Sequence, residues 1–385
     1  MRGRWAVAAL FFVNGFLVGS WAPQIPVFLT RLGIDKFTLG LLILVFGVGA
    51  LVAMPTSGYL MGRHGSRATV RGFASVAVFG LLMVAVAPNV PVAAVAMFVF
   101  GGVVGAMDVA MNANAVSVER HMRRAIMSSS HGFWSLGGFA GGGLGGLLIE
   151  RLGALPHALL VGVVSFVVVL AALRHLIDDD RPQTEEARTG GLPRNPAIYV
   201  IGVLALFCMV PEGAVLDWAA LYLLQELGAS TATAGLAFAA FSGAMALMRF
   251  AGDGVRNRLG AVATLRASAL VAAVGMLVAA FAPDNWLAIA AFAFAGLGIA
   301  NTVPIAFSAA GNFPGLAHGA GMSVATMGYS GILVAPSAIG FIGGKVGFAP
   351  VYVAVGLLLV VVAVLAGFAR HADGAETQAI PSAAL

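Results

Sequence analysis

Charged residues are scarce in this chain. Only 10% of its 385 residues are Asp, Glu, Lys or Arg, whereas 60% are hydrophobic and the mean hydropathy is +0.97. Water-soluble domains carry about 25% charged residues, and a soluble fold could not hide this much apolar surface. The composition therefore predicts a polytopic helical membrane protein, with the lipid bilayer as its surroundings.

Cysteine and catalytic motifs are also scarce. Cys208 is the single cysteine, so an intrachain disulfide and a cysteine-based metal site are both excluded. The sequence contains no HExxH or GxSxG motif and no Walker-type Gly-Lys-Ser/Thr loop, which argues against a hydrolase and against ATP-driven transport. We therefore expect no enzymatic activity, no cofactor and no metal. The net charge of +5 reflects membrane topology, and we expect no nucleic-acid partner.

The sequence instead contains apolar runs long enough to cross a bilayer, which takes about 20 helical residues. These runs do not alternate between apolar and polar residues, so a porin-like barrel is excluded. We predict an all-α membrane protein with twelve spans near 5–30, 37–62, 69–87, 91–117, 125–149, 154–176, 196–225, 231–255, 262–281, 286–311, 317–343 and 347–369.

One connection between spans, residues 177–195, is polar, charged and rich in proline and glycine. Such a composition is typical of a solvent-exposed linker. The sequence therefore predicts an N-terminal six-helix bundle (1–176), a cytoplasmic linker (177–195), a C-terminal six-helix bundle (196–370) and a disordered tail (371–385).

Basic residues fall mostly on one side of the predicted membrane. With both termini in the cytoplasm, sixteen of the 21 lysines and arginines face the cytoplasm, four face the other side, and Arg249 lies within a span. Cytoplasmic loops of membrane proteins carry such an excess of basic residues. The bias predicts a multi-pass protein of a bacterial inner membrane with cytoplasmic termini.

The two predicted halves repeat each other at a constant offset of 195 residues. This offset spans six helices, an even number, so the two copies share one orientation and are related by an axis along the membrane normal. The matching pairs run without a gap: Leu32 and Leu227, Gly40 and Gly235, Phe46 and Phe241, Arg63 and Arg258, Gly65 and Gly260, Pro88 and Pro283, and Met127 and Met322.

The loop after the second span resembles the signature loop of the major facilitator superfamily, in which a glycine precedes an acid-Arg-x-Gly-Arg run. Gly58, Arg63, Gly65 and Arg67 match this pattern, and Gly62 stands where the family has its acid. A second copy of the loop follows the eighth span, at the repeat offset.

Two stretches, 107–138 and 217–230, resemble the fucose-permease-like branch of bacterial inner-membrane proteins within that superfamily. The resemblance implies two pseudo-symmetric six-helix halves, alternating access to one central site, and proton coupling. The implied partners are a small-molecule substrate and protons, and we expect a monomer.

Asp108 and Asn112 lie inside the fourth predicted span, four residues apart and therefore on one face of a helix. A charge at membrane depth costs about 3 kcal/mol unless it is paired, protonated or in contact with water. We predict that this face lines a polar cavity, where both residues bind substrate and Asp108 couples transport to protons. The alternative is a buried aspartate that only holds helices together.

Polar and aromatic side chains also mark the first and fifth spans. Asn14, Trp21 and Gln24 share a face of the first span and suit a hydroxylated substrate, since an amide both donates and accepts hydrogen bonds. His131 and Trp134 open the fifth span, and a histidine can hold a proton near neutral pH. The alternatives are an interfacial tryptophan and a hydrated histidine at a helix start.

The seventh span carries two acids, Glu212 and Asp217, with Trp218 beside the second. A straight helix turns residues five apart by about 140°, so we expect one of the two acids to face the cavity. We favour Glu212, as a substrate ligand and the second proton-coupling group, and keep Asp217 and Trp218 as further substrate ligands. Asn301 and Tyr329 are candidates for the cavity wall of the second half.

A further set of residues is assigned to gating, because it belongs to the two signature loops or to the inner end of the eighth span. Its members are Gly58, Arg63, Gly65, Arg67, Arg249, Asp253 and Arg258.

Together these features predict a secondary active transporter that moves a small polar, sugar-like solute by alternating access. Two alternatives remain from the residues: proton-coupled efflux of amphipathic compounds, which would need mostly apolar cavity walls, and a transporter-like sensor that binds a ligand without moving it.

Overall fold

The computed structural model describes residues 2–122, 126–178, 195–313 and 328–373, and every regular element in these ranges is a helix. The first half contains α1 (Arg2–Trp21), η1 (Ala22–Gln24), α2 (Ile25–Leu32), α3 (Lys36–Ala77), α4 (Gly80–Val86), α5 (Val90–Met122), α6 (Met127–Leu152) and α7 (Ala154–Leu173). The second half contains α8 (Pro196–Glu226), α9 (Thr231–Leu259), α10 (Ala261–Ala280), α11 (Asn285–Ile299), α12 (Thr302–Gly311), α14 (Gly328–Val346), α15 (Ala349–Leu365) and η2 (Ala366–Asp373).

Ten helical stretches in the described ranges are long and apolar enough to cross a membrane. One of them, Lys36–Val86, is 51 residues long and is interrupted at Gly65, so it holds the second and third predicted spans. The predicted eleventh span falls partly on 314–327, outside the described residues, and α14 forms its remainder. The predicted all-α membrane architecture is confirmed.

The outward faces of these helices are apolar. Val167 of α7 and Val364 of α15, for example, expose 60% and 74% of their surface. Lipid tails are as apolar as leucine, so they surround such side chains without cost. We therefore expect these apolar helix faces to contact lipid.

The helix starts obey the 195-residue repeat as well. Asp35 caps α3 by accepting the Thr38 N–H at 2.8 Å, and Ser230, at the repeat offset, caps α9 through the Thr233 N–H at 3.2 Å. Caps of this kind satisfy backbone N–H groups that have no partner inside the helix. Local sequence thus fixes where equivalent spans of the two halves begin.

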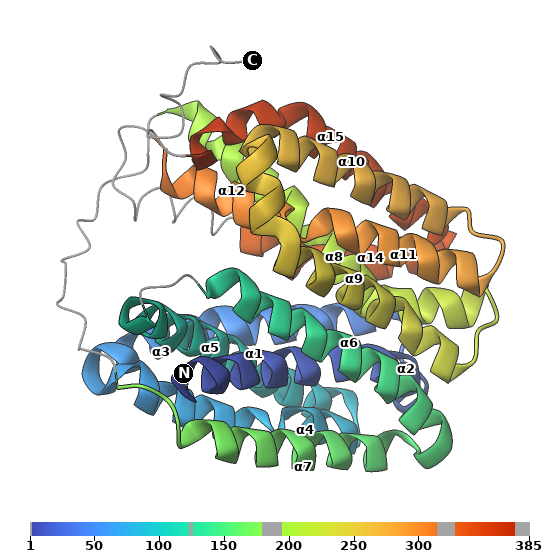
Figure 1. Ribbon diagram of the computed structural model, residues 1–385. Coiled ribbons are helices and arrows are strands. Elements are labelled where there is room, and N and C mark those ends of the chain that lie inside the picture. The colour runs from blue at the N-terminus through green and yellow to red at the C-terminus, as the bar shows by residue number, and fades with distance from the viewer. Residues whose placement is uncertain (1, 123–125, 179–194, 314–327, 374–385) are drawn as a thin grey trace.

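Two groups of helices lie against each other in Figure 1, α1 to α7 in one and α8 to α15 in the other, and α6 packs along α9 at their boundary. Glycines allow this close approach. A Cβ on Gly235 would lie 2.7 Å from the carbonyl oxygen of Gly142, and one on Gly40 would lie 2.7 Å from that of Pro336 in α14. The two boundaries α6–α9 and α3–α14 therefore depend on small residues.

Polar contacts join the two groups at the end where α1, α6 and α8 finish. The Lys36 ammonium donates to the Gly343 carbonyl at 3.2 Å, and Glu150 accepts the Ala232 N–H at 2.8 Å. The Trp21 side chain also lies next to the Asp217 carboxyl. In this state the halves are held together at the end that the sequence predicts to be periplasmic.

Candidate functional site

Arg249 of α9 lies at the boundary between the two halves. Its Nη1 donates to Ser135 Oγ of α6 at 2.6 Å and to the His131 carbonyl at 3.5 Å. Its Nη2 lies 3.8 Å from a carboxylate oxygen of Glu212 in α8. The side chains of Arg249 and Glu212 are only 12% and 22% exposed, so this ion pair sits inside the helical region and links α6, α8 and α9.

Trp134 extends this polar cluster to α1 and α5. The Arg249 guanidinium lies over its ring, 5.9 Å from the ring centre, which is the geometry of a cation–π contact. The indole N–H donates to Asn14 Oδ1 at 2.9 Å, and the Asn14 amide donates to the Val104 carbonyl at 3.2 Å. One chain of contacts therefore runs from α5 through α1 and α6 to α9.

His131 is also close to this cluster. Its ring meets Phe11 edge-on at 5.1 Å between ring centres, and its backbone carbonyl is the one that Arg249 reaches. The structure therefore brings together four of the predicted substrate ligands, namely Asn14, His131, Trp134 and Glu212.

The two acids of the seventh predicted span point in different directions, as the pitch of a helix predicts. Glu212 pairs with Arg249, whereas Asp217 is buried to 6% exposure and meets Trp21 from the other half. Asp217 and Trp21 thus belong to the closed end of the molecule.

Asp108 and Asn112 share one face of α5, as predicted, and both are half-buried. The Asn112 amide donates to the backbone carbonyl of Asp108 at 2.8 Å. The Asp108 carboxyl forms no ion pair with any residue that the structure describes. A carboxyl at membrane depth is less costly when it is protonated or bound to a polar ligand.

Two further candidates, Gln24 and Trp218, lie elsewhere. Gln24 lies in η1, where its amide donates to the Ala154 carbonyl at 2.8 Å and meets His157 Nδ1 at 2.9 Å, so it faces α7 rather than Asn14. Trp218 is completely buried against Phe348, 5.5 Å between ring centres, in the aromatic core of the second half.

The reason for both differences is packing. α1 ends at Trp21, and a 3-10 turn that contains Pro23 follows it. This change of helix type places Gln24 on a different face from Asn14. Trp218 carries the largest apolar surface on α8, and burial of that surface decides its direction.

Asn301 lies at the break between α11 and α12 and is half-buried. Tyr329 belongs to α14, but its side chain lies outside what the structure describes, as does that of Asp253 in α9.

Ser135 and Ser242 are site residues that sequence reasoning missed. Ser135 receives the Arg249 hydrogen bond, and Ser242 Oγ donates to the Ser135 carbonyl at 2.8 Å. A serine within a glycine-rich helix gives little signal by itself. The spacing of four between His131 and Ser135 was the available clue, since it places them on one face.

Two of the cavities in the described structure lie away from this cluster. One, of about 430 Å³, is bordered by Asn195, Phe313 and Arg370, and the other, of about 360 Å³, is bordered by Trp5, Phe12 and Leu136. The predicted central cavity therefore stays a prediction.

A comparison with known sequences decides the family. A profile described as Major Facilitator Superfamily matches residues 7–211 and again 202–384. The chain belongs to the major facilitator superfamily. This facilitator is 36% identical over 363 residues to an uncharacterised MFS-type transporter of Yersinia pestis, and the match covers 92% of each chain.

Solved structures share the fold of this facilitator. A D-xylose-proton symporter has a TM-score of 0.76 at 16% identity and covers 94% of this chain and 96% of its own. The fucose:proton symporter FucP of E. coli has a TM-score of 0.64 at 20% identity and covers 95% and 98%. Such low identities show a common fold, and the assignment to the fucose-permease-like branch stays a prediction.

The signature loops of the facilitator hold most of the predicted gating residues. Gly65 has φ 81° and ψ 164°, and Gly260 has φ 76° and ψ 165°, a backbone that favours glycine at both positions. Arg63 donates to the Tyr59 hydroxyl at 2.9 Å, and Arg67 pairs with Asp178. A Cβ added at Gly58 would meet no atom within 4 Å, and Arg258 is exposed.

Arg249 differs from the other predicted gating residues. Its side chain contacts Glu212, Ser135 and the His131 carbonyl, which places it in the polar cluster between the halves. We therefore treat Arg249 as a site residue.

Proposed function

We propose that this facilitator is a secondary active transporter that moves a small polar, sugar-like solute by alternating access, coupled to protons. The observation that carries the proposal is the position of Arg249, which contacts Ser135 of one half and Glu212 of the other. A buried cation held between two moving halves responds both to a ligand and to the charge of its acid partner.

Glu212 is the proposed proton-coupling group next to Arg249. The ionised carboxylate attracts the guanidinium across 3.8 Å, and a proton on Glu212 removes that attraction. Arg249 can then bind a hydroxyl of the solute or strengthen its bond to Ser135. Asp108, on α5, is the proposed second proton-coupling carboxyl.

The substrate side of the proposal is supported by the amide, indole and guanidinium groups of Asn14, Trp134 and Arg249. Such groups hydrogen-bond hydroxyls and stack against sugar rings, whereas amphipathic compounds need mostly apolar walls. The solved structures with this fold include symporters named for D-xylose and for fucose with protons, which supports the same solute class.

The membrane assignment belongs to the same proposal. We place the facilitator in a bacterial inner membrane as a monomer, with both termini in the cytoplasm, on the strength of the excess of arginine on one side. Thiol labelling of single cysteines introduced at the exposed positions His64 and Ser230, in a Cys208→Ala background, tests this orientation. Labelling of position 230 from outside and of position 64 from inside is expected, and the reverse pattern would refute it.

Reconstitution into liposomes tests the function. The purified chain is assayed for counterflow of D-xylose, L-fucose and carboxylated sugars, and for proton movement that accompanies each solute. Glu212→Gln is expected to keep counterflow and to lose roughly tenfold or more of the uptake driven by a pH gradient. Arg249→Gln is expected to weaken both.

Glu226→Gln is the matched control, because Glu226 is on the same helix but accepts the Phe348 N–H at 2.7 Å at the closed end. It should leave proton coupling unchanged. Uptake by Glu212→Gln that still follows the pH gradient would refute the role of Glu212. Ligand binding without counterflow of any solute would favour a sensor instead, and counterflow of apolar dyes alone would favour efflux.

A further inference from the structure

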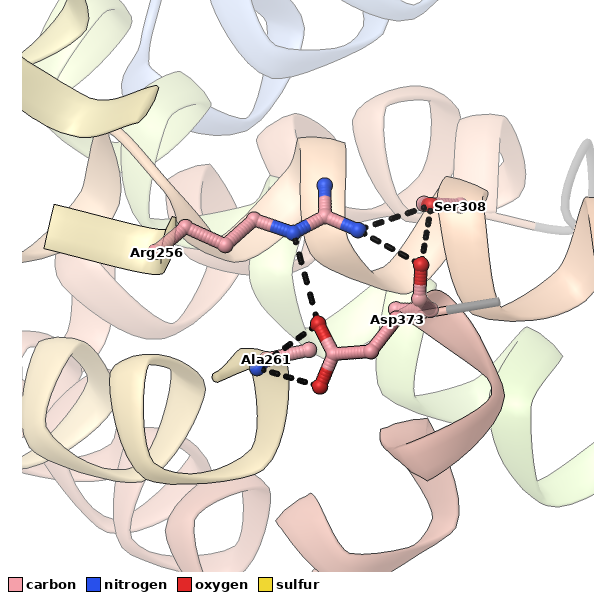
Figure 2. A network of polar contacts seen from close by, with 5 residues as sticks. Arg256, Ala261, Ser308 and Asp373 are labelled. Carbon is pink, nitrogen blue, oxygen red and sulfur yellow. Dashed lines mark hydrogen bonds and ion pairs between the residues drawn. The ribbon is translucent and has the colours of Figure 1, made fainter. Parts of the chain in front are cut away.

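The segment that follows the last long helix of the second half is bound to the loop between α9 and α10. Figure 2 shows the Asp373 carboxylate facing the first turn of α10, where both of its oxygens accept the Ala261 N–H at 3.0 and 2.8 Å. The same carboxylate lies 3.8 Å from Arg256 Nε. Asp373 therefore caps α10 and neutralises part of the positive charge at that helix start.

The backbone next to Asp373 is held as well. Arg256 Nη2 donates to the Ala372 carbonyl at 2.6 Å and to Ser308 Oγ at 3.1 Å, and Ser308 donates to the same carbonyl at 3.2 Å. These contacts join η2 to α9, α10 and α12.

The first half contains a related arrangement, in which the acid follows the repeat offset. Asp178 stands 195 residues before Asp373, shortly after α7 ends, and pairs with Arg67 of the signature loop. Ile177 stands 195 residues before Ala372, and its carbonyl likewise accepts a side-chain hydrogen bond, from Asn114 of α5 at 3.0 Å. In each half an aspartate that follows the last helix therefore pairs with an arginine, although the two arginines are not at equivalent positions.

In a third pair of contacts the two arginines follow the same offset. Arg71 donates to the Leu173 carbonyl of α7 at 3.0 Å, and Arg266 donates to the Ala363 carbonyl of α15 at 3.3 Å. In each half, an arginine of the third span thus holds the last helix by its backbone.

Charge explains why the carboxylate comes from outside the loop. Residues 62–71 contain three arginines and no acid, and residues 256–266 also contain three arginines and no acid. Cations crowded at a helix N-terminus repel each other and the helix dipole. The aspartate that follows the last helix of each half brings a carboxylate close to these arginines.

We propose that Asp178 and Asp373 are positioning residues, which anchor the last helix of each half to the loop between its second and third helices so that the half moves as one body. The anchor of the second half is the stronger one. Asp178 is 77% exposed and screened by water, whereas Asp373 is 24% exposed and has two backbone contacts besides the ion pair. In this proposal residues 366–373 belong to the rigid body that the second half forms.

Hydrogen exchange of the full chain tests the anchor without any knowledge of the substrate. Asp373→Ala is expected to speed exchange at 256–266 and 366–373 on the order of tenfold, as the loss of a cap predicts, and to leave the first half unchanged. Arg256→Gln should do the same, and the double variant should add little, because both changes break one network. Unchanged exchange, or effects that simply add, would overturn the anchor.

Two controls separate the anchor from general damage. A chain that ends after Asp373 keeps the network and should behave as the full chain does, whereas one that ends after His371 should behave as Asp373→Ala does. Asp284→Asn changes a capping carboxylate at the other end of the same half and should leave 256–266 protected. If Asp373→Ala does not fold, Arg256→Gln and the two shortened chains carry the test.

The transport consequence rests on the proposed function and is measured separately. For a solute that shows counterflow, Asp373→Ala should slow counterflow several-fold at unchanged solute Kd. Faster hydrogen exchange with unchanged counterflow would refute the positioning role, and it would leave the solute and proton assignment of the site untouched.

Discussion

The indole N–H of Trp134 donates to Asn14 Oδ1 at 2.9 Å, and this bond joins α6 to a residue of α1 that is only 2% exposed. It is the hydrogen bond through which the polar cluster around Arg249 reaches α1. Its loss would leave a buried amide oxygen without its donor.

Trp134→Phe is expected to lower the free energy of unfolding by about 1–3 kcal/mol, because it leaves Asn14 Oδ1 unpaired while the ring still fills its place. It should also weaken binding of the solute, since the cluster loses its fixed geometry. Thermal unfolding in detergent and a binding titration measure the two effects. Trp5→Phe is the control, because Trp5 is 60% exposed, and an equal effect of both variants would contradict the assignment.

Gly235→Ala is expected to destabilise the contact between α6 and α9. Its Cβ would lie 2.7 Å from the Gly142 carbonyl oxygen, which is backbone and cannot turn aside, and overpacking of this kind costs about 1–3 kcal/mol. Gly143→Ala is the matched control, since its Cβ would meet Ala239 at an ordinary 3.5 Å. Melting temperatures compare the two, and a stable Gly235→Ala variant would show that the halves do not pack as described.

Asp35 predicts a pH dependence at the start of α3. The hydrogen bonds from the side chain and the backbone N–H of Thr38 hold the pKa of its carboxyl below the ordinary value of 3.8. The stabilisation is therefore complete above pH 3.8 and is lost as the pH falls through the lower pKa of the folded state.

Hydrogen exchange at the first turn of α3, followed from pH 6 to pH 3 and corrected for intrinsic exchange, measures this loss. Asp35→Asn keeps a side-chain acceptor at the cap without a proton to gain, so its protection should not fall over that range. A wild-type chain that behaves like this variant would rule out the role of the carboxylate.

Several features of the site could be predicted from the sequence because they are local. Asp108 and Asn112 share a face of α5, and Glu212 and Asp217 point to different partners, as the pitch of a helix requires. Arg249 was harder, because its place at the inner end of the eighth span suggested a gating residue. Two of its partners, Glu212 and Ser135, come from other helices.

The sequence by itself determined the membrane class, the positions of most spans, and the repeat of 195 residues that places equivalent caps and equivalent loop glycines in the two halves. These follow from hydropathy, helix pitch and backbone chemistry, which act over a few residues. Tertiary structure alone decided which polar groups meet. Trp134 and Asn14 are 120 residues apart, Arg249 and Ser135 are 114 apart, and Ala261 and Asp373 are 112 apart. A helix surface offers several polar neighbours at once, and only the packing of the other helices selects among them.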